Sequence, residues 1–142
     1  MYLKIFSFLY TAPTMPPTTI AAVNTSSTSI RVEWSEILPR YRHGIVRQYR
    51  IFYREENAFL NNTKNFTVTS NETRIYQPNS TSTSSSRRRR AVTTPLERFA
   101  TNITGLKIFT NYSIQIRGIT ILEGPDSSPI VVITDEDREF AF

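Results

Sequence analysis

Residues 106–118 read L-K-I-F-T-N-Y-S-I-Q-I-R-G, and this stretch decides the fold. From Tyr112 onward the residues alternate, with Tyr112, Ile114, Ile116 and Gly118 on one side and polar residues on the other. A period of two with β-branched residues on one side is typical of a half-buried strand. A tyrosine at the start of such a strand can bury its ring and bond a nearby backbone group through its hydroxyl, as in the tyrosine corner of Greek-key sandwiches. The stretch therefore predicts a two-sheet β-sandwich and offers no chemistry.

The rest of the chain supplies further short strands separated by turn-rich segments. We expect them over residues 19–23, 28–35, 45–54, 65–70, 99–103 and 130–134. Residues 73–77 are an alternative strand, so the assignment between residues 65 and 103 stays open. The inward positions of these runs predict a structural core of Trp34, Tyr49, Ile51, Leu106, Tyr112 and Ile114. With no helical period and no internal repeat, the pattern predicts an all-β, seven-stranded, Greek-key immunoglobulin-like sandwich.

One long segment interrupts this pattern. Residues 78–97 hold a Ser/Thr-rich run followed by four arginines, a composition that predicts a disordered insert. The expected organisation is a leader-like or linker segment over residues 1–15, a domain over 16–137 and an exit toward a following domain over 138–142. The apolar run at residues 5–10 is shorter than the roughly 7–15 residues of a signal peptide. A shortened leader and an incomplete gene start therefore both remain open.

Composition excludes several classes of site. The 142 residues include no cysteine and one histidine, His43, so neither a disulfide nor a thiolate zinc site can form. The net charge is +5, and it falls to +1 without the arginine run, which argues against a nucleic-acid-binding face. No run approaches the ~20 apolar residues of a membrane span. We expect no catalytic residue, no cofactor and no metal, because no second histidine or convergent carboxylate pair accompanies His43.

Several landmarks occur in the order typical of one family. A tryptophan lies in the second strand, His43-Gly44 precedes the third, and later landmarks include a Gly-Leu-x-x-x-Thr-x-Tyr motif and a Gly-Pro-x-Ser turn. The matching residues are Trp34, Ile45, Tyr49, Ile51, Tyr53, Gly105, Leu106, Thr110, Tyr112, Gly118, Gly124, Pro125, Ser127 or Ser128, Pro129, Thr134, Glu136 and Asp137. Ile108 stands where the family usually has proline. On these residues the chain resembles a fibronectin type III domain over roughly residues 16–137, apart from the insert.

The resemblance implies a non-catalytic extracellular interaction or spacer module of a larger cell-surface receptor or adhesion protein. Its partners would be other extracellular proteins and the neighbouring domains of the parent chain. The loops over residues 36–44 and 122–128 would lie at one end of the sandwich and are the candidate contact surfaces. If the parent is a receptor phosphatase or kinase, its catalytic domain lies outside these residues.

Two sequence features add candidate sites. Asn-x-Ser/Thr acceptors make seven asparagines candidates for N-linked glycosylation: Asn24, Asn61, Asn65, Asn71, Asn79, Asn102 and Asn111. The run Arg87, Arg88, Arg89 and Arg90 fits the basic pattern cut by furin-like convertases. The same run supports an alternative function, a secreted or processed factor that binds polyanions such as heparan sulfate weakly. A solvated charged loop is the third interpretation of these arginines.

Overall fold

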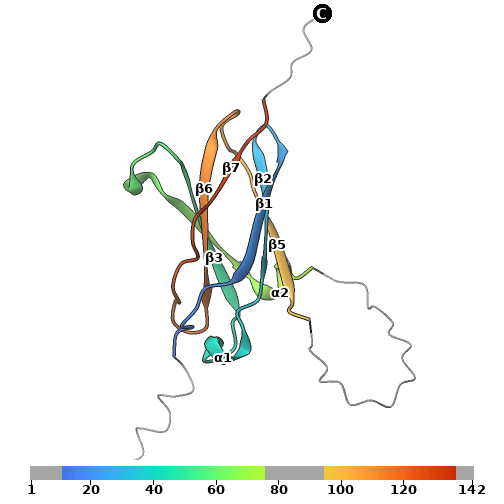
Figure 1. Cartoon of the computed structure of the whole chain (residues 1–142), viewed down its shortest axis with the longest axis vertical. Helices are drawn as coiled ribbons and strands as arrows, with labels where there is room; N and C mark the ends of the chain where they lie inside the picture. Colours follow the sequence, from blue (N-terminus) through green and yellow to red (C-terminus); the bar gives the residue numbers. More distant parts are fainter. Residues whose placement is uncertain (1–10, 76–94, 137–142) are drawn as a thin grey trace, which may run out of the picture.

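Seven strands form two antiparallel sheets in the computed structural model, which describes residues 11–75 and 95–136 (Figure 1). The first sheet has the order β1-β2-β5 and the second the order β4-β3-β6-β7. The strands are β1 (Thr18–Ser26), β2 (Ser29–Ser35), β3 (Gln48–Glu55), β4 (Lys64–Thr69), β5 (Arg98–Ile103), β6 (Asn111–Ile119) and β7 (Ile130–Ile133). β2 pairs with β5, and β3 pairs with β6, so strands distant in sequence are neighbours in each sheet. The predicted Greek-key sandwich is confirmed.

Within residues 11–75 and 95–136, three short helices lie between the strands, where the sequence predicted none. The loop expected over residues 36–44 contains one turn of helix, α1 (Pro39–Arg42), which begins on a proline and ends at His43 in the left-handed conformation. Proline suits the first helical position because its missing N–H would be unpaired there anyway. The other two are the 3-10 helix η2 (Leu60–Asn62) and α2 (Ser70–Thr73).

The alternative strand over residues 73–77 is wrong for its described part. Thr73 ends α2, and Arg74 makes only an isolated bridge to Phe99. Most of the insert expected over residues 78–97 lies outside the described residues. Glu97, however, belongs to the sandwich, because its carbonyl accepts a 2.9 Å hydrogen bond from the backbone N–H of Glu36.

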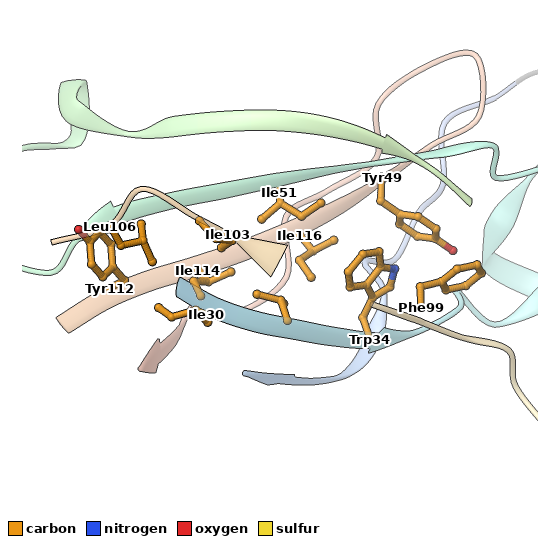
Figure 2. Packing of buried hydrophobic residues seen from close by; sticks show 11 residues of the cluster. Ile30, Trp34, Tyr49, Ile51, Phe99, Ile103, Leu106, Tyr112, Ile114 and Ile116 are labelled. Atoms are coloured by element: carbon orange, nitrogen blue, oxygen red, sulfur yellow. The ribbon is translucent and has the colours of Figure 1, made fainter. Parts of the chain in front are cut away.

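The core lies between the two sheets as one continuous cluster (Figure 2). At one end the Trp34 ring packs edge-on against Tyr49, with ring centroids 5.3 Å apart, and stacks on Phe99 at 6.0 Å. At the other end lie Leu106 and Tyr112 (Figure 2). Isoleucines fill the space between: Ile30, Ile51, Ile103, Ile114 and Ile116. All six residues expected in the core belong to this cluster.

The inward row of β6 follows the predicted alternation, with one difference on the outward row. Tyr112, Ile114, Ile116 and Gly118 are buried, and Ser113, expected outside, is buried as well. Ser113 lies between Arg54 of β3 and Val131 of β7 in the middle of the sheet. Neighbouring strands on both sides therefore cover its small side chain.

Candidate interaction surfaces

Three segments meet at one end of the sandwich, which we call the α1 end: residues 11–15, 36–47 and 119–129. The loop with α1 and the β6–β7 loop lie together at this end (Figure 1). Residues 11–15, expected to be linker, run between them. The Thr14 N–H donates a 3.0 Å hydrogen bond to the Tyr41 carbonyl, and the Thr120 hydroxyl donates a 3.1 Å bond to the Thr11 carbonyl. The entering chain thus ties the two loops together.

Backbone hydrogen bonds and a buried serine fold the β6–β7 loop back on β6. The N–H of Gly124 donates to the carbonyl of Gly118 at 2.9 Å. Ser127 is buried; its N–H donates to the carbonyl of Ile116, and its hydroxyl accepts from the N–H of Ile116, both at 2.9 Å. The sequence left Ser127 and Ser128 as equivalent candidates for this turn, and the structure places Ser127 in it.

A network of ion pairs around Arg117, called the Arg117 ladder below, holds the same loop against the outer face of the four-stranded sheet. Arg117 binds both carboxylate oxygens of Asp126, at 2.7 and 3.0 Å, and one oxygen of Glu123 at 2.6 Å. Glu123 also pairs with Arg50 of β3. Hydrogen bonding to Asp126 raises the pKa of Arg117 above its ordinary value. The Arg117 guanidinium lies 4.4 Å from the centroid of the Phe52 ring and covers one face of that ring.

Apolar side chains project from these fastened loops. Ile45 is 71% exposed, Ile121 65% and Leu122 54%. Scattered exposed apolar residues are ordinary on protein surfaces, but several gathered on neighbouring loops are typical of contact sites. The α1 end therefore combines a fixed backbone with three exposed apolar side chains on two of its loops.

A hollow of about 220 Å³ lies beside the α1 end, next to the Tyr49 ring. Charged residues surround it, including Glu36, which pairs with Arg42 at 2.7 Å, and Arg74, which pairs with Glu97 at 3.3 Å. Burial, followed by the negative charge of Glu36, raises the pKa of the Tyr49 hydroxyl well above its usual value near 10. The phenol is thus held in its neutral form.

A larger hollow, of about 490 Å³, lies at the opposite end of the sandwich beneath the β3–β4 connection. On its lining the Lys107 ammonium pairs with Glu55 at 2.8 Å, and this bond raises the pKa of Lys107. The hydroxyl of Tyr112 accepts a 2.9 Å hydrogen bond from the backbone N–H of Lys107. This bond is the tyrosine corner that the sequence predicted.

The described glycosylation candidates differ in accessibility. Five are exposed: Asn61, Asn65, Asn71, Asn102 and Asn111. Asn24 is half-buried, and its side-chain nitrogen donates a hydrogen bond to Asp135. Asn79 and the run Arg87, Arg88, Arg89 and Arg90 lie outside the described residues.

The described residues contain no cluster of three or more metal-ligating side chains. His43 instead lies at the end of α1, where its ring nitrogen is 3.2 Å from the hydroxyl of Thr14. In the same part of the chain no helix is long and apolar enough to cross a membrane.

The architecture and the tyrosine corner place the protein among the immunoglobulin-like Greek-key sandwiches. A family model described as "Fibronectin type III domain" matches residues 15–133. The chain belongs to the fibronectin type III domain family.

Known proteins with similar sequences and structures agree with this assignment. Receptor-type tyrosine-protein phosphatase F of Mus musculus is 28% identical over 127 residues, and the Homo sapiens protein is 27% identical over 126. Each match covers 88% of this chain and only 5% of the phosphatase. The FN5 domain of Drosophila Lar is 27% identical, with a TM-score of 0.51 over 85% of this chain and 98% of that one. The fn3 domain of human contactin 1, at 20% identity, shares the fold with a TM-score of 0.65 over 94% of this chain and 88% of that one.

Proposed function

We propose that this chain is an extracellular, non-catalytic module of a cell-surface receptor or adhesion protein, and that it binds another extracellular protein through the α1 end. The observation that carries the proposal is the set of apolar side chains on loops whose backbones are held in place. Ile45, Ile121 and Leu122 are exposed there, on loops fastened by hydrogen bonds and the Arg117 ladder. A preorganised apolar surface favours binding because little conformational entropy is lost on association.

The cell-surface location is proposed from the known proteins whose sequences are similar to this chain. The curated relatives are named as receptor-type phosphatases, and the stretch they share with this chain is its fibronectin type III domain. Catalysis in such a parent would belong to residues beyond this chain, since the match spans 5% of the relatives. The module itself contributes display and spacing.

The proposal can be tested with the full chain displayed as a multivalent bait against a panel of purified receptor and adhesion ectodomains. For any partner found, replacing both Ile121 and Leu122 with serine should weaken binding at least about tenfold, as expected when central apolar contacts are removed. The matched control is Phe59→Ser, which removes an 82% exposed aromatic at the opposite end of the sandwich. Equal loss in the control, or no loss in the double variant, would place the contact elsewhere.

A second measurement tests the location. Antibodies against the module should stain intact cells that express the endogenous protein. Staining that needs permeabilised cells would refute the extracellular assignment.

A further inference from the structure

Three of the exposed acceptors lie along a single edge of the molecule. β4 is the last strand of its sheet and pairs only with β3 among the described strands. Asn61 lies in η2 just before β4, Asn65 lies within β4, and Asn71 lies in α2 just after it. The six residues of β4 span ~20 Å. One acceptor therefore precedes β4, one lies near the start of the strand, and one follows its end.

The folded structure has room for a sugar at each of these positions. All three asparagines are exposed. Asn65 lies opposite Phe52 in the β3–β4 pair, so it follows the outward row of the sheet. At Asn24, in contrast, the nitrogen that would carry the glycan is hydrogen-bonded to Asp135 at the β1–β7 side. A glycan on Asn24 would replace one of the two hydrogens on that nitrogen and would crowd its contact with Asp135.

An open strand edge also needs protection. Unpaired backbone groups along such an edge can pair with another chain, and natural proteins usually block this with charges, prolines, bulges or a covering segment. β4 contains no proline and only one charged residue, Lys64. Bulky hydrophilic groups on Asn61, Asn65 and Asn71 would cover the edge along its whole length.

We infer that Asn61, Asn65 and Asn71 carry N-linked glycans that shield the β4 edge and leave the α1 end bare for protein contacts. Segments 11–15, 36–47 and 119–129 contain no asparagine, so no acceptor lies on the surface proposed to bind protein. The inference rests on the proposed extracellular function, since N-glycans are added in the secretory pathway.

The test is site-by-site occupancy in a secreted protein. The full chain would be expressed in mammalian cells behind an added signal peptide, and enzymatic removal of N-glycans in ¹⁸O-water followed by mass spectrometry would mark each occupied asparagine. We expect Asn61, Asn65 and Asn71 to be occupied and Asn24 to be unmodified. The triple variant N61Q/N65Q/N71Q should run faster on a gel by three glycan steps, and each single variant should run faster by one.

Two controls keep the result interpretable. Asn62 is next to Asn61 but is not itself an acceptor. Asn62→Gln should therefore leave the gel mobility unchanged. Pro125→Asn creates an acceptor in the exposed β6–β7 loop and should add one step, which shows that the secretory machinery modifies this chain. If Pro125→Asn adds its step while the three β4 positions stay bare, the inference is wrong. The proposed binding function would survive that outcome, because the added signal peptide forces secretion in either case.

Discussion

Gly118 leaves the space that the side chain of Ile37 occupies. A β-carbon built at residue 118 would overlap the Cδ1 atom of Ile37, whose side chain is fully buried. The inward row of β6 thus ends in a residue without a side chain because a residue from the α1 loop fills that place. This contact joins the core to the α1 end.

Gly118→Ala should destabilise the protein by about 1–3 kcal/mol, as overpacking of a filled core does. Ile37→Val removes the clashing methyl group and should cost about 0.5–1.5 kcal/mol alone. The double variant should be more stable than the sum of the two changes predicts, because the shorter side chain relieves the overlap. Urea unfolding of the four proteins measures this coupling, and strict additivity would show that the two residues do not compete for space.

Tyr112→Phe should lower the free energy of unfolding by about 1–2 kcal/mol. The change keeps the buried ring but removes the acceptor for the N–H of Lys107, and an unpaired donor at this corner is costly. Tyr53→Phe is the matched control, because the Tyr53 ring neighbours that of Tyr112, with centroids 6.5 Å apart, and its change leaves the bond between Lys107 and Tyr112 in place. If thermal or urea unfolding shows the same loss of stability in both variants, the hydrogen bond of the tyrosine corner does not contribute specifically to stability.

Stability should fall at alkaline pH partly through Tyr49. Burial raises the pKa of its hydroxyl in the folded protein, whereas the unfolded tyrosine ionises near pH 10. Above about pH 10 the folded state therefore binds more protons than the unfolded state, and the free energy of unfolding decreases by up to about 1.4 kcal/mol per pH unit from this group. Below pH 10 the contribution is fully present.

The measurement for Tyr49 is urea unfolding from pH 8 upward. Tyr49→Phe should show a shallower alkaline decline than the unmodified protein. Tyr41→Phe, which removes the hydroxyl of a partly exposed tyrosine in α1, is the matched control. Parallel slopes for all three proteins would contradict the assignment.

Arg117→Ala should destabilise the protein by about 1–2 kcal/mol, because it removes a two-pronged carboxylate contact and the cover over Phe52. Arg117→Lys keeps the charge but cannot reproduce the planar fork, so it should recover only part of the loss. Amide hydrogen exchange should report faster opening of residues 120–126 in the alanine variant. Unchanged exchange in that loop would mean that its backbone hydrogen bonds alone hold it.

The sequence predicted the sandwich well because its strands obey a simple rule. Alternation places Trp34, Ile51 and Ile114 inward whatever the loops do, and the corner tyrosine follows from its place at the start of β6. Ile37 was missed because it lies in a loop, where no period marks a buried position. The Arg117–Phe52 contact was missed because it depends on how two strands and a loop meet in space.

Two of the missed helices did carry local signals. Pro39 stands at the start of α1, a position that proline favours. Thr69 accepts a hydrogen bond from the backbone N–H of Glu72 at the start of α2, and threonine followed three residues later by glutamate is a known helix-start pattern. Both helices are single turns, too short to show a helical period. The candidate contact surface was foreseen as two loops at one end, but the role of residues 11–15 in tying them together was not.

The backbone hydrogen bond between Ile75 and Arg98 determines where this module can change in length. The N–H of Ile75 donates to the carbonyl of Arg98 at 2.8 Å, so the chain returns to the point it left. For flexible loops in general, the entropy of closure grows slowly with length, by roughly 0.6 kcal/mol per doubling. Exons, cleavage sequences or whole peptides could be gained or lost there over evolution while both sheets kept their pairing. The site is also a natural place to graft a tag.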